Sequence, residues 1–76
     1  MSTYFSALSV AMAHQLSQPP PSSPASVRCG WWREHHDLLI GVADAVDVGR
    51  QEADRARQLA GHALGEVRSL LCEAVS

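Results

Sequence analysis

The sequence predicts an all-α protein with a short N-terminal helix, a Pro-rich linker and a long or hairpinned amphipathic C-terminal helix that pairs as in a coiled coil. Three observations predict this class. Apolar residues recur every three or four positions near the N-terminus, all four prolines lie within residues 19–24, and apolar residues recur every seven positions over residues 31–75. We therefore divide the 76 residues into an N-terminal helical segment (1–17), a Pro/Ser-rich linker (18–30) and a heptad-patterned helical region (31–76).

The N-terminal segment is predicted to be helical over residues 3–17. Its apolar positions fall three or four residues apart, as on one face of a helix, and are Phe5, Leu8, Met12 and Leu16. The opposite face is polar and carries Ser6, Ser9, His14 and Gln15. Isolated helices of this length are marginal in water, so we expect this one to lie on another helix. The alternative is a frayed segment.

The linker is centred on the run from Pro19 to Pro24. Proline fixes φ and removes a backbone donor, so the chain is expected to leave any helix here and run extended. The run also contains a P-x-x-P pattern, which aromatic-lined grooves of other proteins bind. We interpret it as a spacer.

The C-terminal region carries two apolar series at heptad spacing. The first series is Trp32, Leu39, Val46, Ala53, Ala60, Val67 and Ala74, and the second is His35, Val42, Gly49, Ala56, Ala63 and Leu70. Spacing of seven over six repeats is typical of a left-handed helix-on-helix seam. Nine of these positions are the predicted self-association and protein-binding residues: Leu39, Val42, Val46, Ala53, Ala56, Ala60, Ala63, Val67 and Leu70.

Two geometries satisfy the heptad pattern. One is a continuous helix that pairs with a second copy, and the other is a hairpin that breaks near Asp47-Val48-Gly49. Glycine costs about 1 kcal/mol in a helix interior, and Asp47 is a suitable N-cap for a second helix. The heptad phase continues through Gly49, which favours the continuous helix. Eleven alanines make the interior thin, so in either geometry we expect a dimer or a bound partner, with a homodimer favoured.

Charge and composition limit the partners. The chain has six Arg, no Lys and eight acidic residues, a net charge of −2, which does not provide the basic surface that nucleic acids or anionic membranes attract. No apolar run approaches the roughly 20 residues that span a bilayer. The mildly apolar stretch 5–10, followed by Ala11-Met12-Ala13, leaves a secretory signal open, but the first 13 residues contain no Lys or Arg. We expect a cytoplasmic protein without membrane contact.

Residues with metal-binding or nucleophilic side chains lack the spacing that such chemistry needs. The candidates are Cys29, His35, His36, His62 and Cys72. Zinc ligands usually come in tight pairs such as C-x₂-C, and a reactive thiol needs a neighbouring base. We therefore expect no catalytic residue, metal ion or cofactor.

A helix-turn-helix is the alternative function class. In that interpretation residues 47–49 form the turn, and the residues facing the major groove are Arg50, Gln51, Arg55, Arg57 and Gln58. Asp47 stands where this turn favours glycine, and Glu52 and Asp54 oppose contact with phosphates.

The adjacent tryptophans Trp31 and Trp32 are the candidate partner anchors, because tryptophan is enriched at binding hot spots. The alternative is that both pack the N-terminal helix onto the main helix. These observations favour a non-enzymatic helical interaction module that binds and modulates a larger protein, as an adaptor, an inhibitor or an assembly factor does.

Overall fold

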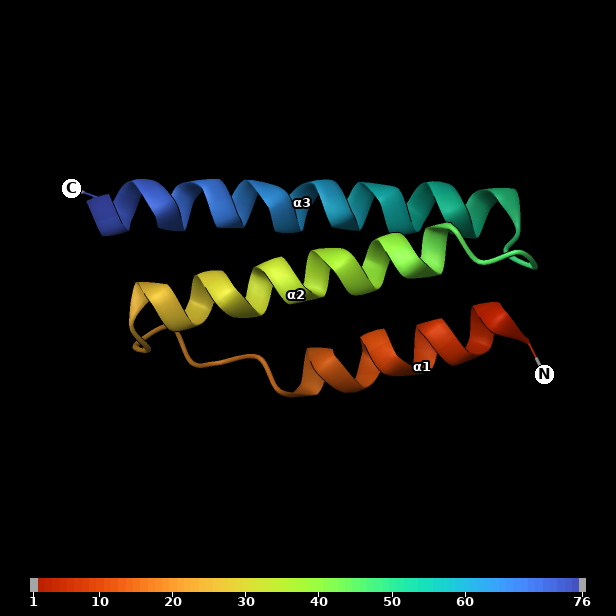
Figure 1. Ribbon diagram of the computed structural model, residues 1–76, viewed down its shortest axis with the longest axis horizontal. Coiled ribbons are helices and arrows are strands. Elements are labelled where there is room, and N and C mark those ends of the chain that lie inside the picture. The colour runs from red at the N-terminus through yellow and green to blue at the C-terminus, as the bar shows by residue number, and fades with distance from the viewer. Residues whose placement is uncertain (1, 76) are drawn as a thin grey trace.

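Three helices form the protein in a computed structural model that describes residues 2–75, and side chains through residue 73. They are α1 (Thr3–Leu16), α2 (Ala25–Ala43) and α3 (Arg50–Val75), and residues 2–75 contain no strand. The predicted all-α class is therefore confirmed. The helices lie side by side with α2 in the middle, and each runs antiparallel to its neighbour (Figure 1). The principal extents of the molecule are 44 × 20 × 12 Å.

Helix α1 begins with a capping hydrogen bond and packs through small residues. The Ser2 hydroxyl accepts a hydrogen bond from the Phe5 backbone N–H at 3.2 Å. Ala11 is buried against Val42 and Ala43 of α2, with Tyr4 beside it. Alanine at the contact lets the two backbones approach closely.

The face of α1 that packs on α2 is not the predicted one. Phe5, Met12 and Leu16 of the predicted apolar stripe remain 65%, 61% and 90% exposed. The buried face is turned by about 100° round the helix, and it includes His14, which the sequence placed on the polar side. The stripe predicted to be the packing face is thus largely free surface.

Helix α2 begins at Ala25, so the predicted end of the linker at residue 30 is wrong. Pro24 stands at the N-cap, where its missing N–H is no loss. Its carbonyl accepts the Val27 and Arg28 N–H groups at 3.0 and 3.1 Å. The proline that was predicted to hold the chain extended instead starts the helix.

The chain turns back between α2 and α3, so the expected continuous helix is wrong and the hairpin is the geometry observed. Helix α2 ends at Ala43 and α3 starts at Arg50. Val46 therefore lies in the loop, 92% exposed, instead of in the seam. The loop has six residues, and with this length the apolar positions of α2 and α3 happen to stay seven residues apart along the sequence. The heptad pattern therefore continues through the loop although the helix does not.

Most of the predicted self-association residues lie on α2 and α3, which pack on each other within one chain. Those with buried side chains are Leu39, Val42, Ala53, Ala56, Ala60, Ala63, Val67 and Leu70. Ala63 is fully buried, at 0% exposed. Contacts between α2 and α3 thus account for most of the burial that the heptad pattern predicts.

Candidate protein-interaction groove

A groove runs along α2 between α1 and α3. Both outer helices contact α2, but no Cα atom of α1 comes within 8 Å of one in α3 among the described residues. Two neighbouring cavities of about 290 and 350 Å³ fill this space and share Leu8, Leu39 and Leu59 as lining residues. We call this space the α1–α3 groove.

The floor and walls of the α1–α3 groove are mainly apolar. The floor comes from α2 and consists of Trp32, His35, Leu39 and Val42. The α1 wall consists of Tyr4, Leu8, Ala11, Met12 and Gln15, and the α3 wall consists of Gln51, Glu52, Arg55, Ala56, Leu59 and His62. Met12 and Leu59 are exposed at the two rims. A partner would thus meet apolar side chains on both sides.

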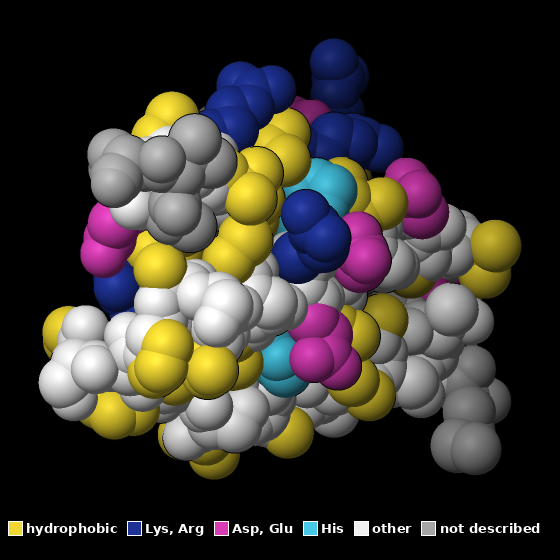
Figure 2. Space-filling view, turned by 60° about the vertical axis from the view of Figure 1, so that its left-hand side comes forward, with side chains coloured by type: hydrophobic (Ala, Val, Ile, Leu, Met, Phe, Trp, Pro, Cys, Tyr) yellow, Lys and Arg dark blue, Asp and Glu magenta, His cyan; other side chains and the backbone are white. Residues whose placement is uncertain are grey.

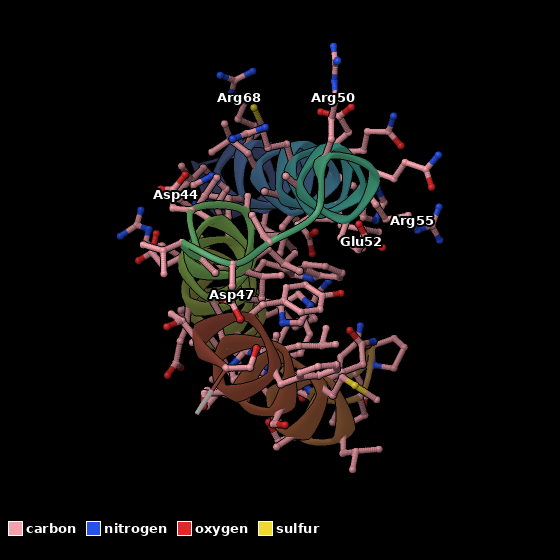
Figure 3. All side chains as sticks on the ribbon, turned by 90° about the vertical axis from the view of Figure 1, so that its right-hand side faces the viewer. Asp44, Asp47, Arg50, Glu52, Arg55 and Arg68 are labelled. Atoms are coloured by element: carbon pink, nitrogen blue, oxygen red, sulfur yellow. The ribbon has the colours of Figure 1, made fainter. Side chains whose placement is uncertain are left out.

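The two rims differ in charge. Helix α1 contains no Asp, Glu, Lys or Arg. Figure 2 shows charged side chains gathered on the upper part of the molecule and mainly apolar and uncharged side chains on the α1 side below. Viewed from the loop end, Glu52 and Arg55 lie on the groove side of α3, whereas Arg50 and Arg68 point away from it (Figure 3). Of the two rims, only the one formed by α3 carries Asp, Glu, Lys or Arg side chains.

A stack of aromatic rings joins α1 to α2 at one end of the groove. Trp31 stacks on His14 and on His35, each with ring centroids 4.6 Å apart. His14 Nδ1 lies 3.0 Å from His35 Nδ1, and the Trp31 indole N–H donates to the Ser17 hydroxyl at 3.3 Å. Burial lowers the pKa of His35, with a further lowering by the neighbouring His14.

Asp47 of the α2–α3 loop holds the other end of α1. One carboxylate oxygen accepts the Tyr4 backbone N–H at 2.8 Å, and the other accepts the Ser2 hydroxyl. The Ser2 hydroxyl and the Tyr4 N–H lower the pKa of Asp47, because both hydrogen bonds favour the charged form. Figure 3 shows Asp47 pointing from the loop to the first turn of α1. The residue expected to cap α3 caps α1 instead.

The two candidate partner anchors have different surroundings. Trp31 is only 7% exposed and lies within the aromatic stack, as in the alternative that the tryptophans pack α1 onto α2. Trp32 is half-buried and lines the groove, with its ring edge-on to that of His62. Trp32 is therefore the tryptophan that a ligand in the groove can touch.

Several groove residues were not singled out as binding residues from the sequence. Leu8 and Met12 were predicted to contact another helix, and Leu59 belongs to neither heptad series. The pairing of His14 with His35, 21 residues apart, has no sequence signal, because it depends on how α1 is rotated on α2.

The part of the chain described gives little support for a metal site, a thiol-based active site or a membrane-spanning helix. No three His, Cys, Asp or Glu side chains there lie close enough to hold a metal ion. Cys29 is half-buried and Cys72 exposed, and both are free thiols. None of the helices described has the length and apolar character needed to cross a membrane.

No protein-family model, curated protein or solved structure matches this chain.

Proposed function

We propose that this protein is a non-enzymatic helical interaction module that binds an amphipathic helix of a larger protein in the α1–α3 groove. The observation that carries the proposal is that α1 and α3 both contact α2, while no described Cα atom of α1 lies within 8 Å of one in α3. The arrangement therefore resembles a four-helix bundle that lacks one helix. A helix laid in the groove would cover Leu8, Leu39 and Leu59 together.

The dimensions and chemistry of the groove suit a helix. Helix α2, which forms the floor, has 19 residues, and a helix of that length spans about 28 Å. A ligand helix with apolar residues at i, i+3 or i+4, and i+7 would place them along this floor. Met12 at the rim has a flexible side chain that adapts to different partners. The protein would act by covering the bound helix, as an adaptor, an inhibitor or an assembly factor does.

A homodimer is the second proposal, and the uncharged surface of α1 favours it. Phe5, Met12 and Leu16 form an exposed apolar stripe on a helix without charged side chains. Two such stripes can meet across a two-fold axis without like-charge repulsion. The coiled-coil seam proposed from the heptads would then be replaced by contacts of α1.

Free thiols fit a reducing compartment such as the cytoplasm.

The helix-turn-helix alternative has less support from the geometry. Helices α2 and α3 run antiparallel side by side (Figure 1), whereas the two helices of that motif cross at about 90–120°. Arg50 and Arg55 point in different directions from α3 (Figure 3), so they do not form one reading face. Crosslinking in the native host would also detect binding to duplex DNA.

Photo-crosslinking in the native host tests the proposed site. A benzophenone amino acid at Leu59 lies on the groove wall, and one at Leu64 lies on α3 outside the residues that line the groove. We expect a discrete adduct with a larger protein from position 59 and not from position 64. Adducts with a second copy alone would support the homodimer instead. Equal adducts from both positions, or adducts with DNA only, would contradict the groove proposal.

A further inference from the structure

The strongest unassigned feature is the contact between His14 of α1 and His35 of α2. The two Nδ1 atoms are 3.0 Å apart, and the rings are stacked with an angle of 18° between their planes. His35 is buried, and its ring also stacks on Trp31. Titratable residues are uncommon inside so small a core, and this pair lies where α1 meets α2.

The contact needs one unprotonated nitrogen. At 3.0 Å one Nδ1 must donate a hydrogen and the other must accept it. A single added proton is compatible with the pair, because Glu34 lies 3.4 Å from His14 Nε2 and can balance a charge there. Once both rings carry charge, both Nδ1 atoms are donors, so the hydrogen bond is lost and two positive charges face each other.

Among residues 2–73, no carboxylate forms an ion pair with His35. Helix α1 has no acidic side chain, and Glu34 on α2 faces His14. The titratable residues that face the cluster from α3 are His62 and Glu66, and Glu66 lies 3.9 Å from His62 Nε2. Arg28 of α2, near Trp32, is paired with Glu73 at 3.0 Å. The second proton therefore meets a buried and uncompensated site.

We propose that the His14–His35 pair is a pH-sensitive latch that holds α1 on α2 at neutral pH and releases it under mildly acidic conditions. Because α1 is one wall of the α1–α3 groove, release would also dismantle the groove. That consequence rests on the proposed function, whereas the latch itself does not.

The direction of the pH dependence follows from the lowered pKa of His35. The docked state binds fewer protons than the released state, in which His35 returns to its ordinary pKa of 6.5. Docking of α1 therefore weakens as pH falls through 6.5 toward the lowered value. Each pKa unit of lowering changes the docking equilibrium by about tenfold.

Hydrogen exchange on the full chain, without any partner, tests the latch. Protection factors of α1 amides are measured between pH 7.5 and 5.0, with α3 amides as the internal reference. We expect the α1 protection to fall as the pH is lowered, while the α3 protection is retained. A fall common to α1 and α3, or none in α1, would overturn the proposal.

Three variants locate the effect. His35→Phe keeps a ring in the stack but cannot take a proton, so the α1 protection should no longer depend on pH. His14→Phe removes the second charge but leaves His35 buried, so it should reduce the fall without abolishing it, which provides a second variant if the first folds poorly. His36→Gln, which lies outside the residues that line the groove and pairs with Asp37, should keep the wild-type dependence. If His35→Phe and His14→Phe retain the wild-type fall, the latch is contradicted. Since no partner is present, this failure is distinct from a failure of crosslinking at Leu59.

Discussion

Asp47 Oδ1 accepts the backbone N–H of Tyr4 at 2.8 Å, although the two residues are 43 positions apart. This hydrogen bond ties the α2–α3 loop to the first turn of α1, where the helix dipole favours a negative charge. Together with the His14–His35 pair, it fixes α1 on α2 at both ends. The exposed stripe of α1 is thereby held in one orientation.

Asp47→Asn should loosen α1, because the amide keeps the shape but removes the charge that the Ser2 hydroxyl and the Tyr4 N–H stabilise. We expect faster hydrogen exchange in the first turns of α1 and unchanged exchange in α3. The contribution of Asp47 is present above its ordinary pKa of 3.8 and is lost as pH falls through the lowered value. Asp44→Asn, an exposed residue of the same loop, is the matched control and should leave α1 unchanged.

Val46→Asp distinguishes the hairpin from a continuous paired helix. Because Val46 is exposed in the loop, we expect its substitution to change the free energy of unfolding by no more than about 0.5 kcal/mol. Val42→Asp buries a charge against Ala56 and should destabilise by more than about 3 kcal/mol. Urea unfolding followed by circular dichroism measures both. A large loss of helicity in Val46→Asp would contradict the hairpin and support a continuous paired helix.

Ala63→Leu tests the close approach of α2 and α3. The alanine is fully buried, so a larger side chain must push the helices apart, at a cost of about 1–3 kcal/mol. Gly61→Ala, two residues away on α3, is the control. A methyl group there would meet no atom within 4 Å, so we expect it to stabilise by about 0.5–1 kcal/mol. Equal destabilisation by both substitutions would contradict the assigned seam.

Phe5→Glu tests the proposed homodimer. A charge on each α1 stripe would face its copy across the two-fold axis, and we expect the dimer dissociation constant to rise at least about tenfold, or 1.4 kcal/mol. Sedimentation velocity at several concentrations measures it. Val10→Glu, an exposed residue outside the stripe, should leave association unchanged. A wild-type chain that stays monomeric at high concentration would contradict the proposed homodimer.

The helical content and most of the seam could be predicted from the sequence. Alanines and leucines at heptad spacing are buried wherever a second helix covers them, and Ala53, Ala60 and Val67 are buried here. The same pattern fits a parallel pair of two chains and an antiparallel hairpin of one chain. The heptads therefore could not decide between them, and Val46 was misplaced for that reason.

The groove could not be predicted, because it depends on the rotation of α1. Both the alanine face and the face with Phe5 and Met12 are apolar, so periodicity does not choose between them. Asp47 and the aromatic stack with His14 decide the rotation, and both are tertiary contacts between distant residues. Only the structure brings Leu8 and Leu59 to opposite sides of one cavity.

The most direct test of the central claim is methyl NMR of the isotope-labelled chain titrated with a synthetic peptide of the partner segment crosslinked from position 59. We expect the largest shifts at the methyl groups of Leu8, Met12 and Leu59, and little change at Leu64 and Leu71. Shifts centred on Leu64 and Leu71, with the groove methyl groups unmoved, would contradict a helix bound between α1 and α3.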